Sequence, residues 1–201
     1  KLGNNVINYF QKNNLSTNFL NVDKNHQTGQ VLITLKSGEP DYEILENVAW
    51  DYIPFKNDYL KDCNNFDCIV YGSLGIRNDV SYMTLKKLIS LSTFKIFDLN
   101  LRQNFYSKLK VNYLLNESDF LKINMEELLK LGSIFKFKYS DTNSLIESIY
   151  LKFNLKFICV TNGSINSSIY DGNNFIIIDS FRVKSIDNLG AGDNFLACFI
   201  N

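Results

Sequence analysis

The sequence predicts an α/β fold in which helices cover both faces of a mostly parallel sheet. Four short apolar runs, beginning near residues 68, 94, 120 and 157, have no polar alternation, which is typical of strands buried on both faces. Between successive runs, apolar residues recur at helical spacing. This alternation indicates crossover helices that connect parallel strands.

Before the alternating part, the chain has two elements of another kind. Residues 2–13 carry Leu2, Val6 and Phe10 at helical spacing and predict an amphipathic helix. The apolar runs 30–35 and 42–45 are then separated by a segment with glycine and proline, which predicts a β-hairpin. Because the hairpin does not fit the strand–helix alternation, we expect it to project as a small β-flap.

The remaining elements follow in strict order along the chain. Strands are predicted at 68–71, 94–97, 120–123 and 157–160, and helices at 79–91, 104–116, from about 125, and at 142–153. An apolar helix is expected to begin after the small residues at 190–192. Ligands of open α/β sheets bind beyond the carboxyl ends of the strands, so candidate site residues are sought just after each apolar run.

Composition excludes several classes of protein. The chain has 201 residues, of which 45% are hydrophobic, enough to build a core, and its 21 basic and 21 acidic residues balance. Zero net charge gives no electrostatic footprint for nucleic acid or a membrane surface, and no apolar run approaches the length of a membrane span. Cys63, Cys68, Cys159 and Cys198 form no metal-type pairs and His26 is the single histidine. Reduced thiols in a cytoplasmic protein are therefore expected.

The most informative segment is Gly190-Ala191-Gly192-Asp193, which leads into the last apolar helix. A helix amino terminus presents unpaired N–H groups, and small residues let an anion approach them. Asp193 would lie in the first helical turn beside that anion, ready to accept a proton. An ordinary glycine turn before a helix is the structural alternative.

Two more polar segments follow predicted strands. In the first, Asp98 and Asn100 are expected to point the same way along an extended segment, and Arg102 offers a planar, permanently charged fork for phosphate or carboxylate. A strand end with a solvated arginine is the alternative. In the second, Asn124 and Glu127 could lie near a hydrated Mg²⁺. Their spacing also fits a helix capping box, which the local sequence favours.

A fourth segment follows the strand predicted at 157–160. Thr161 and Gly163 stand in a short polar loop, where a hydroxyl and a glycine can hydrogen-bond phosphate oxygens. Most such loops are plain turns.

Together, in this order, the four segments resemble the strand-end motifs of the ribokinase-like carbohydrate kinases, the phosphofructokinase-B family. The resemblance implies a three-layer ribokinase-like sandwich with a mostly parallel central sheet and a small β-hairpin lid. The family's nucleotide loop has a second glycine where this chain has Asn166, and asparagine tolerates positive φ better than most residues, so the resemblance implies that the loop keeps its shape. It also implies roles for the motif residues: catalysis by Asp193, Gly190, Ala191, Gly192 and Arg102, nucleotide binding by Thr161, Gly163 and Asn124, substrate binding by Asp98, Asn100 and Arg102, and metal binding by Asn124 and Glu127.

The same resemblance implies an ATP- and Mg²⁺-dependent sugar kinase. Fructose is the expected acceptor, with ribose or 2-keto-3-deoxygluconate as alternatives. Residues 1–201 are expected to be the central part of one domain, cut at both ends and inactive alone, with residues 28–46 as a lid or as the contact of a homodimer. A non-catalytic fragment is one competing hypothesis. A dinucleotide-binding oxidoreductase is another, although Phe195 stands where its third glycine belongs.

Overall fold

The computed structural model describes residues 1–36, 39–62, 65–184 and 189–201. These residues group into two compact units, one made of Lys1–Ile69 with Ser73–Thr93 and the other of Val70–Gly72 with Phe94–Asn201. We call them unit 1 and unit 2. The expectation that residues 1–201 form one domain stays a prediction.

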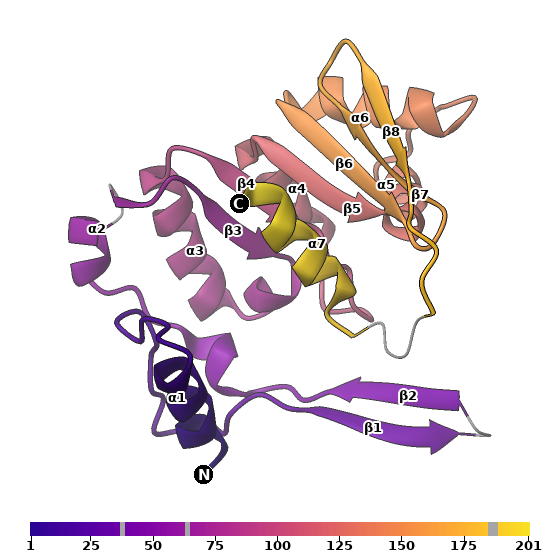
Figure 1. Cartoon of the computed structure of the whole chain (residues 1–201). Coiled ribbons are helices and arrows are strands. Elements are labelled where there is room, and N and C mark those ends of the chain that lie inside the picture. Colours follow the sequence, from indigo (N-terminus) through magenta and orange to yellow (C-terminus); the bar gives the residue numbers. More distant parts are fainter. Residues whose placement is uncertain (37–38, 63–64, 185–188) are drawn as a thin grey trace. The chain divides into compact units, whose positions relative to one another are not determined.

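Unit 2 is built around a six-stranded sheet with the strand order β3-β4-β5-β6-β7-β8 (Figure 1). The strands are β3 (Ile69–Gly72), β4 (Lys95–Asp98), β5 (Phe120–Asn124), β6 (Phe157–Asn162), β7 (Asn166–Tyr170) and β8 (Phe175–Asp179). The helices are α4 (Lys108–Glu117), α5 (Met125–Phe135), α6 (Thr142–Phe153) and α7 (Ala191–Ile200). The mixed α/β class and the four apolar strands predicted from sequence are confirmed.

The end of the sheet that contains β7 and β8 was not predicted. β4, β5 and β6 pair in parallel, whereas β6–β7 and β7–β8 pair antiparallel. β7 has the sequence NSSIY, in which the polar residues leave no apolar run that would predict a strand. The turn before it uses Gly163 at φ 55°. Asn166 begins β7 instead, so the positive φ considered for it is wrong.

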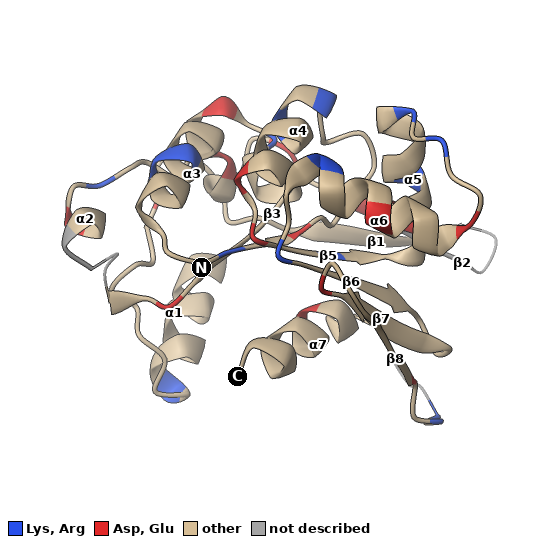
Figure 2. Cartoon of the chain, turned by 90° about the horizontal axis from the view of Figure 1, so that it is seen from above, with Lys and Arg blue, Asp and Glu red and all other residues tan. Residues whose placement is uncertain are grey.

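Helices lie on both faces of this sheet, as predicted. Figure 2 shows α4, α5 and α6 on one side of the strands and α7 on the other. On the α7 side, the rings of Phe120 and Phe199 stack with centroids 5.2 Å apart. Side chains alternate along a strand, so Phe120, Lys122 and Asn124 of β5 face α7, and Leu121 and Ile123 face the other helices.

Local signals explain where the helices of unit 2 begin. The predicted helix 104–116 is α4 and starts later, at Lys108, because the Ser107 side chain accepts a hydrogen bond from the Lys110 N–H and caps it there. The side chain of Asp141 caps α6 in the same way, through the N–H of Ser144.

Tyr71 gives unit 2 a measurable response to alkaline pH. Its hydroxyl lies 3.1 Å from Ser118 Oγ, and burial, helped by the charges of Glu117 and Asp119, raises its pKa far above the usual value of 10.0. Above pH 10 the unfolded chain therefore releases this proton before the folded one, and stability falls as pH rises. This one group contributes a slope of up to about 1.4 kcal/mol per pH unit.

Tyr71→Phe should remove that slope. Denaturant unfolding between about pH 9 and pH 11 should show the wild type losing stability faster than the variant. Parallel pH profiles for the two proteins would contradict the assignment.

Unit 1 contains the amino-terminal helix, the hairpin and the segment around α3. Its elements are α1 (Leu2–Lys12), β1 (Val31–Lys36), β2 (Glu39–Ile44), η1 (Ala49–Tyr52), α2 (Asp58–Asp62), η3 (Leu74–Ile76) and α3 (Asp79–Leu91). β1 and β2 pair antiparallel as a separate two-stranded sheet, which confirms the hairpin. The turn residues 37–38 within the expected lid 28–46 lie outside the described residues. Within the described ranges, no helix has the length and apolarity that a bilayer crossing requires.

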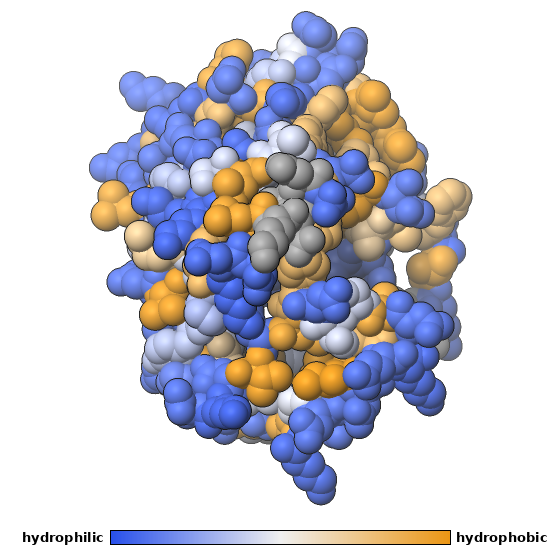
Figure 3. Space-filling view, turned by 90° about the vertical axis from the view of Figure 1, so that its left-hand side faces the viewer, coloured by the Kyte–Doolittle hydropathy of each residue, from blue (hydrophilic) through white to orange (hydrophobic). Residues whose placement is uncertain are grey.

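Apolar side chains also lie on the surface of unit 1. Figure 3 shows orange patches among hydrophilic surface on one face. The exposed apolar residues include Leu60 in α2, Phe66 after α2, and Phe19 in the segment between α1 and β1. The ring centroids of Phe19 and Phe66 lie 5.4 Å apart.

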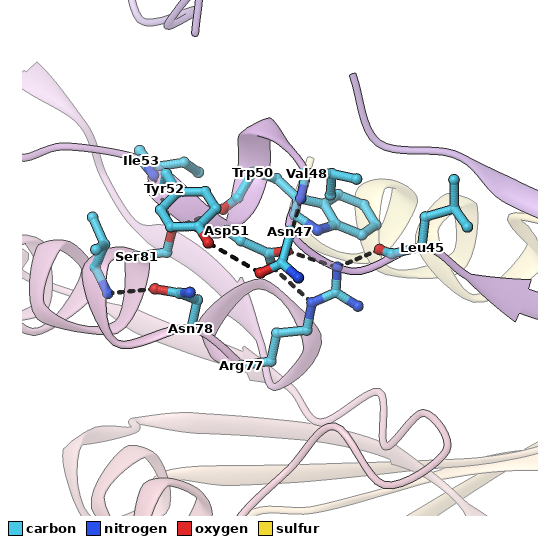
Figure 4. A network of polar contacts seen from close by, with 11 residues as sticks. Leu45, Asn47, Val48, Trp50, Asp51, Tyr52, Ile53, Arg77, Asn78 and Ser81 are labelled. Carbon is cyan, nitrogen blue, oxygen red and sulfur yellow. Dashed lines mark hydrogen bonds and ion pairs between the residues drawn. The ribbon is translucent and has the colours of Figure 1, made fainter. Parts of the chain in front are cut away.

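A buried ion pair holds the segment that follows the hairpin (Figure 4). The Arg77 guanidinium donates to both carboxylate oxygens of Asp51, at 2.7 and 2.8 Å, and also to the Leu45 carbonyl. It lies 5.5 Å from the centre of the Trp50 ring, and Asp51 also accepts from the N–H of Val48. The side chains of Asp51 and Arg77 are only 3% and 6% exposed. This pair therefore fixes the return from the hairpin to η1.

Candidate active site

The amino end of α7 has the geometry expected from its small residues. Gly190 precedes the helix with φ 74°, a left-handed conformation that favours glycine, and no side chain caps the helix. The N–H groups of the first turn are therefore available to a ligand. Asp193 lies in this first turn and is exposed.

The segment after β4 is not extended, which corrects one expectation. β4 ends at Asp98, and the backbones of Asn100 and Gln103 are left-handed, with φ 45° and 46°. The argument that Asp98 and Asn100 share a face by strand alternation is therefore wrong. Left-handed non-glycine residues are uncommon and often lie at functional loops. Arg102 is exposed at the end of this loop.

Lys122, a residue not singled out from the sequence, joins these two segments. It lies opposite Asp98 in the register of β4 and β5, and its Nζ is 3.0 and 2.9 Å from the two Asp98 carboxylate oxygens. A Cβ atom placed on Gly192 would lie 3.1 Å from the same Nζ. The ammonium group therefore lies between the Asp98 carboxylate and the first turn of α7. A single lysine inside the apolar run of β5 was the signal in the sequence.

Asn124 and Glu127 form the capping box that the local sequence favoured. Asn124 Oδ1 accepts the N–H of Glu127 at 2.8 Å, and Glu127 Oε2 accepts the N–H of Asn124 at 3.0 Å. The other Glu127 oxygen accepts the N–H of Leu101 at 2.8 Å. Glu127 thus ties the loop after β4 to the amino end of α5.

Glu127 is 9% exposed, and burial raises the pKa of its carboxyl group, against the opposing effect of the two N–H donors. Glu127→Gln should destabilise the protein by about 1–3 kcal/mol, because an amide cannot accept from both N–H groups at once. The neighbouring Glu126→Gln is the matched control, since Glu126 is exposed. Denaturant unfolding measures both, and equal stabilities would contradict this role of Glu127.

Thr161 and Gly163 lie at the carboxyl end of β6. Thr161 pairs with Asn124 in the register of β5 and β6, and its hydroxyl is 3.5 Å from the Ile123 carbonyl oxygen, a long hydrogen bond. Gly163 has φ 55°, and nothing lies within 4 Å of the position that a Cβ atom would take there. Its carbonyl oxygen accepts a hydrogen bond from the Ser180 hydroxyl at 3.2 Å. Three neighbouring strands, β4, β5 and β6, thus end in the predicted polar segments.

The segment after β4 and the start of α7 lie close together, because Lys122 Nζ is within 3.0 Å of Asp98 and 3.1 Å from the position of a Cβ on Gly192. Burial raises the pKa of Asp98, the bond and charge of Lys122 oppose that shift, and the charge of Asp193 raises the pKa further. The positive charge of Arg102 lowers the pKa of Asp98. The structure thus brings the carboxylates of Asp98 and Asp193 and the cations of Lys122 and Arg102 into one electrostatic neighbourhood.

The dinucleotide-binding alternative requires a glycine motif directly after a strand. β8 ends at Asp179, and residues 180–184 continue without regular structure before α7. In addition, Phe195 stands at the position of the third glycine of that motif.

Together, the sheet with its strand-end segments and the comparison with known proteins define the class. The model of the pfkB family carbohydrate kinases matches residues 1–201. The chain belongs to this family. It is 23% identical over 202 residues to a protein described as a sugar kinase of Pyrococcus horikoshii, and 23% identical over 211 residues to a protein assigned as fructokinase-5 of Arabidopsis thaliana. The matches cover 98% and 100% of this chain but 62% and 64% of those relatives.

Solved structures confirm the fold. A fructokinase with bound ATP from Xylella fastidiosa superposes with a TM-score of 0.80 at 18% identity, over 96% of this chain and 62% of that chain. A structure described as ribokinase II from E. coli gives a TM-score of 0.82 at 21% identity, over 98% of this chain and 66% of that chain. The fructokinase of Vibrio cholerae with bound fructose, ADP and calcium gives a TM-score of 0.76 at 21% identity, over 98% of this chain and 65% of that chain. The ribokinase-like fold class predicted from sequence is thereby confirmed.

Proposed function

We propose that the full-length protein carrying this chain transfers the γ-phosphoryl group of ATP to a hydroxyl group of a small sugar, with fructose as the first candidate. The main support is the common location of the strand-end segments of β4, β5 and β6 and the uncapped start of α7. Fructokinases among its relatives and structural neighbours support the choice of fructose, with ribose and 2-keto-3-deoxygluconate as the alternatives.

In this proposal, Asp193 accepts the proton of the attacking hydroxyl. The N–H groups of Gly190, Ala191 and Gly192 receive the charge of the transferred phosphoryl oxygens, helped by the positive end of the helix dipole. Arg102 stabilises the same charge. Because phosphoryl transfer has a loose transition state, positioning and charge neutralisation dominate its catalysis.

The sugar and the nucleotide would use different strand ends. Asp98 and Asn100, after β4, would hydrogen-bond sugar hydroxyls. Thr161 and Gly163, after β6, would contact the nucleotide, together with the exposed side chain of Asn124. In the E. coli ribokinase II neighbour the bound ligands are ATP and Mg²⁺, which supports these two as the cofactors here.

The residues present fit a magnesium ion held mainly by phosphate and water. Both Glu127 oxygens already accept one backbone N–H each, and the described residues contain no group of three His, Cys, Asp or Glu side chains that could hold a metal. Each carboxylate oxygen keeps a further lone pair for a water molecule. Glu127 and Asn124 would therefore hold Mg²⁺ through its waters, which is its usual manner of binding, and the ion would neutralise phosphate charge.

The remaining assignments are proposals of the same kind. We place the protein in the cytoplasm, where ATP is supplied and where the thiols of Cys68, Cys159 and Cys198, which are free in the structure, stay reduced. Cys63 lies outside the described residues. The hairpin would close over the sugar as a lid, with a homodimer contact as its alternative use.

An ADP-release assay on the full-length protein tests the proposal. We expect ADP formation to require ATP, Mg²⁺ and one sugar from a panel of fructose, ribose and 2-keto-3-deoxygluconate. The 201-residue chain alone is expected to be inactive. Sugar-independent ATP hydrolysis, or nucleotide binding without transfer to any sugar of the panel, would contradict it.

A further inference from the structure

Lys122 is a buried charge for which the mechanism above has no use. It is 6% exposed in the middle of β5, between Leu121 and Ile123, which are fully buried. Burial of an ammonium group is costly unless it is paired and hydrogen-bonded. A buried lysine in a central strand is therefore expected to have a partner that offsets the cost of its burial.

The partner of Lys122 is the Asp98 carboxylate. Both Asp98 carboxylate oxygens accept from Lys122 Nζ, at 3.0 and 2.9 Å, and the two side chains are 8% and 15% exposed. Within the described part of the chain, the structure gives the Asp98 carboxylate no other hydrogen bond. Asp98 ends its strand, and its position is set by a partner on the neighbouring strand.

The lack of a side chain at Gly192 leaves room for the Lys122 ammonium group. Gly192 lies so close that a Cβ there would be 3.1 Å from Lys122 Nζ, tighter than ordinary van der Waals contact. A glycine at 192 thus serves two purposes: it exposes backbone N–H groups, and it admits the Lys122–Asp98 pair beside the first turn of α7.

We propose that Lys122 is a positioning residue for sugar binding, which acts by holding the Asp98 carboxylate toward the acceptor sugar. This inference rests on the proposed function, because it uses Asp98 as a sugar ligand. The pair has no net charge, so the ammonium adds little attraction for the nucleotide phosphates, and its effect passes through Asp98. Without Lys122, Asp98 would lose both hydrogen bonds while it still faces the negative charge of Asp193.

The test compares Lys122→Met, Asp98→Asn and the double variant in the full-length protein. Lys122→Met should raise KM for the sugar at least tenfold and leave KM for ATP within about twofold. Asp98→Asn should behave in the same way. The double variant should be no worse than the poorer single variant, since both changes disable one interaction.

Conservative and matched variants sharpen this result. Lys122→Arg keeps the charge and should recover part of the sugar affinity that Lys122→Met loses. Lys138→Met, a change at an exposed lysine, should leave both KM values unchanged. A merely structural role of Lys122 would lower the amount of folded protein and not separate the two KM values.

Several outcomes would overturn the inference. These are a rise in KM for ATP with unchanged sugar KM, additive effects in the double variant, or no change in Lys122→Met. If Lys122→Met does not fold, Asp98→Asn carries the same expectation, and an unchanged sugar KM there would refute it. A wild-type protein without sugar kinase activity would instead refute the proposed function, so the two failures are distinguishable.

Discussion

Asp193→Ala in the full-length protein should lower kcat by about a hundred- to ten-thousand-fold, the usual contribution of a general base. Asp193 lies in the first turn of α7, next to the uncapped N–H groups that would hold the transferred phosphoryl group. Without its carboxylate, the sugar hydroxyl has no group to receive its proton. Nucleotide binding should persist, because the loop after β6 is untouched.

Steady-state kinetics and a nucleotide titration together measure this prediction. Asp193 is exposed, so its removal should leave the fold intact, and thermal unfolding checks that. Asp179→Asn is a matched control at an exposed carboxylate of β8. Substantial turnover in Asp193→Ala would exclude Asp193 as the base, and loss of nucleotide binding would show that it acts at another step.

Asp51→Ala should destabilise the protein by about 3–5 kcal/mol, the usual consequence of leaving one partner of a buried ion pair uncompensated. Arg77 loses two hydrogen bonds to Asp51 in this variant while its side chain stays 6% exposed. The N–H of Val48 loses its acceptor as well. This is the largest effect on stability that we expect from a single substitution here.

Denaturant unfolding tests this prediction with two controls. Asp67→Ala, at an exposed aspartate of unit 1, should have little effect. Asp51→Ala combined with Arg77→Met should be more stable than Asp51→Ala alone, because no charge is then left buried. A loss in Asp51→Ala as small as that of the Asp67 control would contradict the role of this pair.

Much of the sheet could be predicted because buried parallel strands leave a plain signature. The strands β3 to β6 are short apolar runs, and the helices between them have periodic apolar faces. β7 escaped prediction because its sequence is mostly polar. The apolar pattern predicts a start of α4 near residue 104, but Ser107 caps the helix and begins it at Lys108.

The residues of the candidate site also differ in how far they could be predicted from the sequence. Residues with distinctive local chemistry, such as Gly190 before α7 and the Asn124–Glu127 box, could be recognised from spacing. Lys122 stands out in the sequence as a single lysine within an apolar run, but its role could not be predicted, because it depends on a partner 24 residues away on another strand. The shape of the loop after Asp98 was also not predicted, because the residues on either side of the left-handed Asn100 are held by β5 and α5. The Leu99 N–H donates to the Lys122 carbonyl oxygen and the Leu101 N–H to Glu127.

The central claim is that the start of α7 receives the transferred phosphoryl group, and amide NMR of the full-length protein tests it most directly. ADP, Mg²⁺ and fluoroaluminate, a mimic of that group, are added together with the sugar. The account predicts large shifts of the Gly190 and Gly192 N–H signals, while the signal of Gly132 in α5, which packs against Leu145 of α6, stays unchanged. Ligand-dependent shifts elsewhere, with the signals of Gly190 and Gly192 unmoved, would contradict it.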